Sequence, residues 1–325
     1  MTPDIERALG GLCPDWNLHD VEVDAFLWGG YSNKNYKVRH NKEPFVLRLP
    51  ASTSTSDFAT EYAILRVLAQ VFSEPGNDPP SQNLAHSNLA ELVAAEPAHG
   101  WLLSRWVDAP VLASINGVTG AQLGGYLATL HTQLEQASRL FGKLIAAPPA
   151  TRLVTSIVAD FQRVVDHRDC LEKLRGHLQT LTASADVSRL CHIDLNPWNV
   201  LCDQTPSPAV WTTLDWETLA SAPALFDLVA LSDGYAYNQG YSAADTHALA
   251  EKTLQSYCSA SGQKPNLVAL GEMRKLFWWR EYAWAAARLT SADLSAAVLA
   301  DVRNQRRDYA VLLAPEAAAL GLPLP

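Results

Sequence analysis

The segment "RLCHIDLNPWNVLC", residues 189–202, places polar side chains inside an otherwise apolar run. It holds Asp194 and Asn199, and a further acid, Asp215, ends the strand-like stretch "AVWTTLDW". A loop with an acid and an amide, followed by a strand ending in an acid, can bring three oxygen ligands together. Hard cations such as Mg²⁺ prefer oxygen ligands and are usually held by few protein groups together with phosphates. The pattern predicts that Asn199 and Asp215 bind Mg²⁺ and that Asp194 accepts the proton of an attacking hydroxyl.

A structural interpretation competes with this catalytic one. Asp194 and Asn199 can each stabilise a turn through side-chain to backbone hydrogen bonds, and taken singly each residue favours that explanation. Their joint spacing, with the "LDWE" strand behind them, favours catalysis.

The elements that would position these residues fall into two parts. In the first part, "VDAFLWGGYSNKNYKVRH" predicts two strands around a glycine turn, "PFVLRLP" a third strand, and "LAELVAAEPAHGWLLSRWV" a hairpin turning at "PAHG". Between them, "STSTSDFATEYAILRVLAQVF" has helical periodicity and good capping residues. From Leu112 onward helices dominate to about residue 312, with strand-like pieces only near residues 189–217. The segment "SEPGNDPPSQN" is predicted to be a loop, and the sequence leaves open whether residues 73–83 close over the site.

Composition limits the class of protein. The chain has 325 residues, 48% of them hydrophobic, and a formal net charge of −9. Two lobes with sizeable cores fit this length, and the acidic balance argues against nucleic acid as a partner. The start "MTPDIERALGGL" is unlike a signal peptide, and no apolar run is long enough to span a membrane. With five cysteines read as reduced thiols, we expect a soluble cytoplasmic protein without a membrane partner.

The segments "HIDLNPWNVL" and "LDWE" resemble the catalytic loop and metal-binding strand of a phosphotransferase group that contains aminoglycoside, thiamine and choline/ethanolamine kinases. The resemblance covers most of the chain, from about residue 24 to 290. It implies an α+β, bilobal, protein-kinase-like fold with ATP as co-substrate and Mg²⁺ as cofactor. We expect residues 1–107 to form a nucleotide-binding lobe, a small antiparallel sheet with one helix, and residues 108–325 a mainly helical lobe for catalysis and substrate binding.

The turn "GGYSNKNYKV" resembles the nucleotide-covering loop of choline-kinase-like enzymes. Glycines such as Gly30 let the backbone approach a phosphate closely, and Ser32 and Asn33 can donate hydrogen bonds to it. An ordinary hairpin turn is the alternative interpretation.

Arg48 and Glu61 are charges at positions where burial is expected. Arg48 lies on the strand "PFVLRLP", and Glu61 lies on the apolar side of the helix that follows, so each needs a partner. The resemblance implies that Arg48 binds phosphate, with Glu61 the candidate for its acidic partner. A solvated surface arginine and an acid at the helix edge are the alternative.

The resemblance assigns further residues. In the connector "LLSRWVDAP", the Arg105 carbonyl and the Val107 amide are implied to read the adenine. Asp227 is implied to anchor the catalytic loop by accepting backbone amides, and His192 to orient that loop. Glu217 is implied to position the metal or the substrate. The alternatives are an acid at a helix N-terminus for Asp227 and a surface acid at a strand end for Glu217.

The helix predicted for "KLFWWREYAWAAARLTSADL" bears on the phosphate acceptor. At about 100° per residue, Trp279 and Tyr282 lie within one arc. Ring faces attract quaternary ammonium groups by about 0.5–2 kcal/mol each, and the segment resembles the aromatic helix that helps to cage choline in choline kinases. Core packing is the competing use of the same rings.

The predicted reaction is therefore transfer of the ATP γ-phosphate to the hydroxyl of a small cationic alcohol, choline or ethanolamine in type. The sequence departs from choline kinases after "LDWE", where Thr218 and Leu219 stand in place of the usual aromatic and small residues. Thiamine is an alternative acceptor, because it carries a thiazolium cation and a primary hydroxyl. Aminoglycosides are a third acceptor class. A catalytically inactive, kinase-like binding protein is the alternative outside enzymes.

Overall fold

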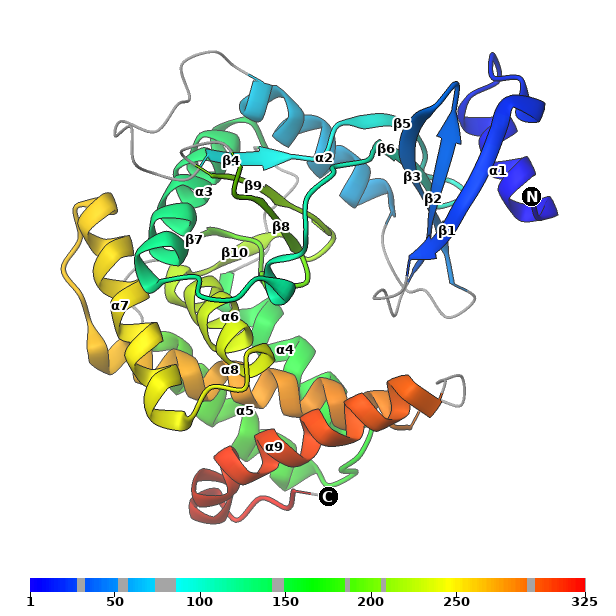
Figure 1. Cartoon of the computed structure of the whole chain (residues 1–325). Helices are drawn as coiled ribbons and strands as arrows, with labels where there is room; N and C mark the ends of the chain where they lie inside the picture. Colours follow the sequence, from blue (N-terminus) through cyan, green and yellow to red (C-terminus); the bar gives the residue numbers. More distant parts are fainter. Residues whose placement is uncertain are drawn as a thin grey trace. The chain divides into compact units, whose positions relative to one another are not determined.

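The structure, a computed structural model, describes residues 1–27, 33–51, 58–73, 86–141, 149–184, 188–205, 209–290 and 296–324. Its helices are α1 (Pro3–Leu12), α2 (Phe58–Ser73), α3 (Gly120–Phe141), α4 (Pro149–Gln162), α5 (Arg168–Ala183), α6 (Ala224–Asn238), α7 (Ala243–Ser261), α8 (Leu267–Arg288) and α9 (Ala296–Leu320). Its strands are β1 (Val21–Leu27), β2 (Asn33–His40), β3 (Glu43–Pro50), β4 (His86–Leu89), β5 (Leu92–Glu96), β6 (Trp101–Arg105), β7 (Ser188–Cys191), β8 (Val200–Asp203), β9 (Val210–Thr213) and β10 (Ala220–Pro223). The predicted α+β class is confirmed (Figure 1). None of the described helices combines the length and the apolarity needed to cross a membrane.

A five-stranded antiparallel sheet in the order β1-β2-β3-β6-β5 opens the chain. The β2–β3 hairpin turns through Asn41 and Lys42, whose φ angles of 52° and 70° suit a two-residue turn that matches the strand twist. The predicted hairpin at "PAHG" is present between β5 and β6. The register pairs Asn35 with Arg48 across β2 and β3. Because neighbouring residues of a strand face opposite sides, Asn33, Asn35 and Arg48 share one face.

The other face of this sheet is covered by α1, a helix that the sequence analysis left out when it predicted one helix in this region (Figure 1). The sequence does contain features typical of a helix N-terminus at this position. Thr2 caps the helix by accepting from the Ile5 amide, and a proline occupies the first turn. Ile5 and Leu9 then lie on one stripe and join the buried core with Leu47 of β3. A helix as short as α1 is only marginally stable by itself, so its local sequence pattern is weak and its stability comes from packing against the sheet.

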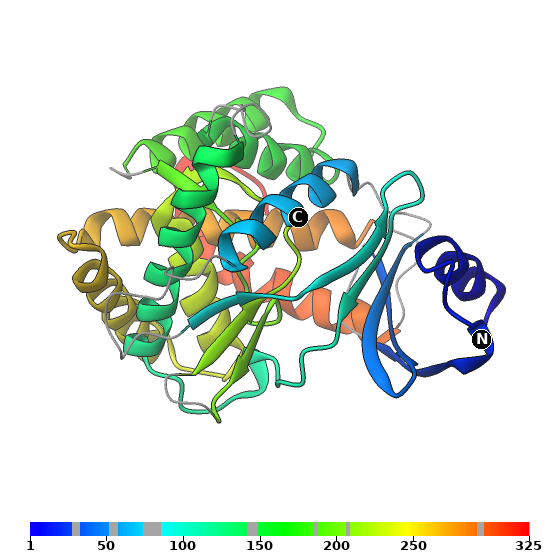
Figure 2. The same ribbon diagram turned by 90° about the horizontal axis from the view of Figure 1, so that it is seen from above.

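A second sheet, in the order β4-β9-β8, carries the residues predicted to do chemistry. β8 and β9 form an antiparallel hairpin, whereas β4 lies parallel to β9, as the view from above also shows (Figure 2). Strands after Leu112 were predicted only near residues 189–217, and β10 extends just beyond that stretch; β4 lies in the first part of the chain and was not among the predicted strands. The four residues of β4 have little local pattern, and their partner lies far away in the sequence.

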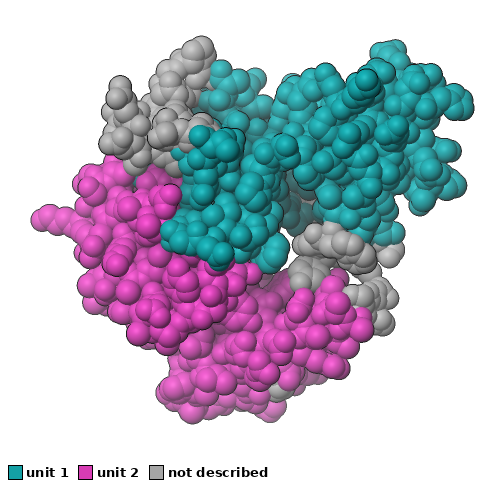
Figure 3. Space-filling view, viewed as in Figure 1, with its two compact units in different colours: residues 1–118, 128–144, 194–219 teal, residues 119–127, 145–193, 220–325 magenta. Residues whose placement is uncertain are grey.

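The chain divides into two compact units, coloured separately in Figure 3. Unit 1 comprises residues 1–118, 128–144 and 194–219, and unit 2 comprises residues 119–127, 145–193 and 220–325. The hairpin of β8 and β9 thus belongs to unit 1. The functional boundary expected between residues 107 and 108 stays a prediction.

Candidate active site

The loop before β8 brings Asp194 and Asn199 into direct contact. The Asn199 Nδ2 donates to the Asp194 carboxylate Oδ2 at 3.0 Å and to the Asp194 carbonyl at 2.9 Å. Asn196 shapes the same loop, because its carbonyl accepts from the Asn199 amide at 3.0 Å. With the nitrogen end of the Asn199 carboxamide facing Asp194, its oxygen end is the group suited to a cation.

The β8–β9 hairpin brings Asp215 next to this loop. Its register pairs Val200 with Thr213, and the Leu214 amide then donates to the Asn199 carbonyl at 2.8 Å. Asp215 was predicted to end the strand, but β9 stops at Thr213, and Asp215 has a left-handed φ of 60°. A left-handed aspartate costs some backbone strain and re-aims the side chain, as is common at functional sites.

Trp216 anchors the turn that holds Asp215. Its ring is 1% exposed, its Nε1 donates to the Thr213 carbonyl at 3.2 Å, and it meets Phe72 of α2 edge-on at 6.3 Å. This role of Trp216 was not predicted from the sequence. A tryptophan between two acids is a signal for it, because only burial explains a large apolar ring beside residues that need solvent or ions.

Arg48 of β3 and Glu61 of α2 form a buried ion pair. The Arg48 Nη1 donates to the Glu61 Oε1 at 2.7 Å, and Nη2 contacts the second carboxylate oxygen. Glu61 is 2% exposed and Arg48 9%. The Arg48 Nη1 also lies 3.9 Å from the Asp215 Oδ1. The structure therefore brings together Arg48, Glu61 and Asp215, and burial of both partners matches the paired alternative rather than the solvated one.

The carboxylates of this cluster outnumber its cations. Burial, then the charges of Glu217 and Asp194, raise the pKa of Asp215 to about 8, and Arg48 opposes them only in part. Asp215 Oδ1 is buried with no hydrogen-bond partner within the described chain. A buried, unpartnered carboxylate oxygen beside two further acids fits a divalent cation. Asn199 and Asp215 would hold Mg²⁺, and the predicted role of Glu217 in positioning the metal or the substrate stays a prediction.

Without divalent cations, the stability of the protein should fall as pH rises from about 4 to about 8. The folded state keeps the Asp215 proton up to about pH 8, whereas an unfolded aspartate loses it near pH 4. The contribution of protonated Asp215 to stability is therefore fully present below its pKa in the unfolded chain. It is lost as the pH rises through its pKa in the folded protein. Tm measured against pH in EDTA should show this slope, which Asp215→Asn should reduce and Mg²⁺ should reverse. An unchanged slope in Asp215→Asn would contradict the assignment.

The nucleotide-binding predictions fall partly outside the described residues, since Gly30 and Ser32 lie there. Asn33 begins β2 and is 9% exposed, and its Oδ1 has no hydrogen-bond partner in the part of the chain that the structure describes. It shares the sheet face of Arg48. An unsatisfied buried amide oxygen on that face is consistent with a polar ligand.

The connector after β6 leaves Arg105 and Val107 in different situations. The Arg105 side chain is exposed and forms ion pairs with Glu43 at 3.0 Å and Glu91 at 2.8 Å. The Val107 carbonyl accepts from the Ala109 amide at 3.0 Å, which turns the chain just after the predicted adenine contacts. The adenine-binding roles of the Arg105 carbonyl and the Val107 amide stay predictions.

Asp227 lies in the first turn of α6 and is fully buried. Its two carboxylate oxygens accept the amides of His192 at 2.7 Å and Ile193 at 2.8 Å. Ile193 has a left-handed φ of 72°, so these bonds hold a strained turn at the start of the Asp194 loop. His192 is 0% exposed. The contacts have the geometry expected of loop support, although that role stays a prediction for both residues.

Trp279 and Tyr282 are both 0% exposed in α8. They meet edge-on at 6.4 Å, and each also contacts the ring of Phe161 in α4. Burial raises the pKa of Tyr282 to about 12. This packing favours the core interpretation weighed for the helix, and a cation cage formed by these two rings stays a prediction.

A family model described as "Phosphotransferase enzyme family" matches residues 25–276. The chain belongs to this phosphotransferase family. The match confirms the resemblance seen in "HIDLNPWNVL" and "LDWE", and membership implies a small-molecule kinase. Among curated proteins, none matches the phosphotransferase.

Solved structures show the fold of the phosphotransferase at low identity. The choline kinase of Streptococcus pneumoniae has a TM-score of 0.64 and 13% identity, covering 96% of this chain and 98% of that one. A choline/ethanolamine kinase family protein from Mesorhizobium loti has a TM-score of 0.60 and 17% identity, covering 96% and 95%. Amicoumacin kinase, in complex with AMP-PNP, Ca²⁺ and Ami, has a TM-score of 0.63 and 14% identity, covering 94% and 92%. These similarities extend over nearly the whole phosphotransferase.

Proposed function

We propose that the protein is an ATP-dependent kinase that transfers the γ-phosphate to the hydroxyl of a small cationic alcohol of the choline or ethanolamine type. The observation that carries the kinase chemistry is the cluster of Asp194, Asn199 and Asp215, in which burial first, and then the charges of Glu217 and Asp194, raise the pKa of Asp215 to about 8. Family membership and the fold of two choline or ethanolamine kinase relatives support the acceptor class. The solved complex of amicoumacin kinase with AMP-PNP supports ATP as the donor.

Each side chain has a defined task in this proposal. The Asp194 carboxylate orients the acceptor hydroxyl and takes its proton as the oxygen bonds to the γ-phosphorus and the bond to the leaving ADP oxygen breaks. The Asn199 amide holds that carboxylate in one orientation through its 3.0 Å hydrogen bond. The Arg48 guanidinium, fixed by Glu61, contacts the phosphates. Mg²⁺, when bound by Asn199 and Asp215, supplies charge neutralisation for the phosphate oxygens. Catalysis is then mainly positioning and electrostatics.

An antibiotic acceptor is the second candidate function. The observation that favours it is the structural similarity to amicoumacin kinase. Its TM-score of 0.63 is nearly the same as the 0.64 of the choline kinase from Streptococcus pneumoniae. Thiamine remains a further acceptor, since it combines a cationic ring with a primary hydroxyl.

One acceptor panel tests the proposal. Purified protein with labelled ATP and Mg²⁺ is offered choline, ethanolamine, thiamine, an aminoglycoside and a homoserine-like alcohol, and the phosphorylated product is quantified. We expect transfer to choline or ethanolamine with the highest kcat/KM. Transfer to the aminoglycoside alone would favour the second candidate. Mg²⁺-dependent ATP binding without transfer to any acceptor would favour the inactive, kinase-like binding protein.

A further inference from the structure

The Arg48–Glu61 pair joins two elements, β3 and α2, so its geometry depends on where α2 begins. Phe58 is the first residue of α2 and lies one helical turn before Glu61. The contacts of the Phe58 ring therefore bear on the position of Glu61.

The Phe58 ring lies against the backbone of Gly100 in the turn between β5 and β6. A Cβ built on Gly100 would meet the Phe58 carbons Cε2 and Cδ2 at 2.6 and 2.7 Å and Cζ at 3.0 Å. Real Cβ atoms do not approach other atoms so closely, so glycine is the residue that lets the ring sit there. Gly100 also has a left-handed φ of 68°, which glycine adopts without strain.

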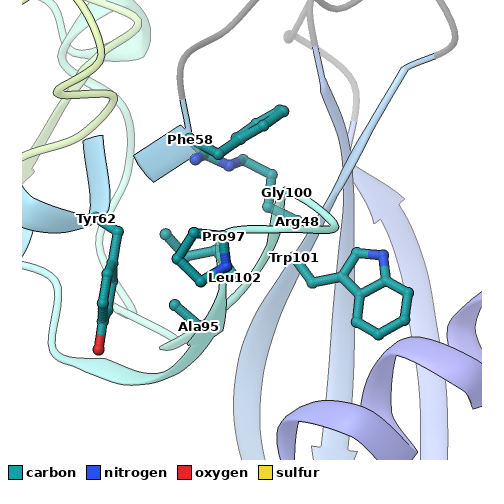
Figure 4. Close-up of a pocket in the computed structure, with 8 residues that line it drawn as sticks. All are labelled: Arg48, Phe58, Tyr62, Ala95, Pro97, Gly100, Trp101 and Leu102. Atoms are coloured by element: carbon teal, nitrogen blue, oxygen red, sulfur yellow. The ribbon is translucent and has the colours of Figure 1, made fainter. Parts of the chain in front are cut away.

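The turn that presents Gly100 is itself fixed. The Gly100 amide donates to the Pro97 carbonyl at 3.2 Å, and the His99 amide donates to the Glu96 carbonyl at 3.1 Å. Trp101, which follows, stacks on His99 at 4.4 Å and points to the opposite side of the sheet from Phe58 (Figure 4). These hydrogen bonds hold the backbone of the turn in place where the Phe58 ring, at the start of α2, contacts it.

The same ring reaches the guanidinium. Arg48 Cζ lies 5.9 Å from the centroid of the Phe58 ring, within the range of a cation–π contact. Arg48 Nε is buried with no hydrogen-bond partner among the described residues, so the guanidinium depends on its other nitrogens and on this ring for orientation. A small hollow of about 10 Å³ adjoins the contact, lined by Arg48, Phe58, Tyr62, Ala95, Pro97, Gly100, Trp101 and Leu102 (Figure 4). A space of this size is about that of one water molecule, so a displaced Phe58 ring does not fit there unless its neighbours also shift.

We propose that Phe58 and Gly100 are positioning residues that hold Glu61 against Arg48 and thereby set the affinity for the phosphates of ATP. This inference rests on the proposed function, since it assigns the pair a role in binding that nucleotide. The added atom of an alanine at position 100 pushes the ring away, shifts the start of α2, and loosens the guanidinium. The acceptor end of the reaction is unaffected.

Gly100→Ala tests the proposal, with Gly117→Ala as its matched control. Gly117 has a similar φ of 75°, but a Cβ there would meet nothing within 4 Å. Both variants carry the same backbone strain, and only the first displaces Phe58. We expect Gly100→Ala to raise the KM and the Kd for ATP about tenfold, or about 1.4 kcal/mol, with the acceptor KM unchanged. Equal ATP affinities in the two variants would overturn the proposal.

A second substitution covers the case in which Gly100→Ala does not fold. Phe58→Leu removes the ring without backbone strain and should raise the Kd for ATP severalfold by itself. In the double variant Gly100→Ala/Phe58→Leu, the two effects should be less than additive, because the clash no longer has a ring to act on. Full additivity, or a normal Kd in Phe58→Leu, would refute the positioning role. Titration calorimetry gives the Kd for ATP without turnover, so it tests the positioning role by itself. Absence of phosphate transfer in the wild type would contradict the proposed function and not the positioning role.

Discussion

Asp194→Asn is expected to lower kcat by about 10³-fold while the Kd for ATP changes less than about threefold. Asparagine keeps the size of the side chain and an oxygen that can accept from the Asn199 Nδ2, now 3.0 Å from Asp194 Oδ2. It removes the group that takes the proton of the acceptor hydroxyl. The measurement is steady-state phosphate transfer beside titration calorimetry with ATP and Mg²⁺. The substitution separates chemistry from binding because the nucleotide phosphates contact other residues.

Asp203→Asn is the matched control. Asp203 ends β8 in the same hairpin, and its carboxylate bonds to the Thr205 amide at 2.9 Å, so the change is chemically identical but concerns a local turn. Its kcat should stay within about twofold of wild type. Near-normal turnover in Asp194→Asn would remove Asp194 as the base. A loss of ATP binding equal to the loss of kcat would instead make it a binding residue.

Glu61→Gln is expected to destabilise the protein by about 3–5 kcal/mol, because it leaves the buried Arg48 charge without its carboxylate. Glu61 is 2% exposed, so water cannot replace the lost interaction. Urea denaturation gives the free energy of unfolding, and calorimetry gives the Kd for ATP, which should weaken as well. The exposed pair of Arg39 and Asp24, at 2.6 Å, supplies the control. Asp24→Asn should change stability by less than about 1 kcal/mol.

The apolar double variant Arg48→Met/Glu61→Leu distinguishes a structural pair from a functional one. Replacing both charges by apolar groups of similar volume removes the desolvation cost, so stability should return to within about 1–2 kcal/mol of wild type. ATP binding should not return, because the guanidinium is gone. Recovery of both properties would show that the pair serves the fold alone. Loss of stability equal to that of Glu61→Gln would mean that packing around Phe58 and Tyr62 depends on the charges.

Several features of the fold and of the candidate site were predicted from local sequence patterns, because they depend on residues that are close together in the chain. The Asp194–Asn199 loop and the β5–β6 hairpin each depend on residues close together in the sequence, so their spacing encodes their geometry. The burial of Glu61 followed from its place on an apolar helical stripe. The parallel pairing of β4 with β9 could not be predicted this way, because it joins residues more than a hundred positions apart. Register between distant strands is decided by tertiary packing.

The aromatic helix shows a different limit. Trp279 and Tyr282 have the spacing of a ligand wall and of a core stripe alike, since both uses require rings on one arc of a helix. Only the neighbours distinguish the two, and here the ring of Phe161 in α4 contacts both, at centroid distances of 6.0 and 6.3 Å, which favours core packing. The left-handed φ of Asp215 was equally hidden, because it arises from the hairpin pairing that stops at Thr213.

The division of unit 1 into three separate stretches has a consequence for biosynthesis. During translation, β4 emerges long before β9, the strand beside which it lies, so the nascent chain carries an unpaired β edge throughout synthesis of the intervening segment. Such edges template aggregation, and closing so long a loop is slow. Until residue 219 has left the ribosome, the N-terminal sheet exists without the hairpin that completes its unit. We therefore expect the growing polypeptide to be most prone to aggregation over that interval.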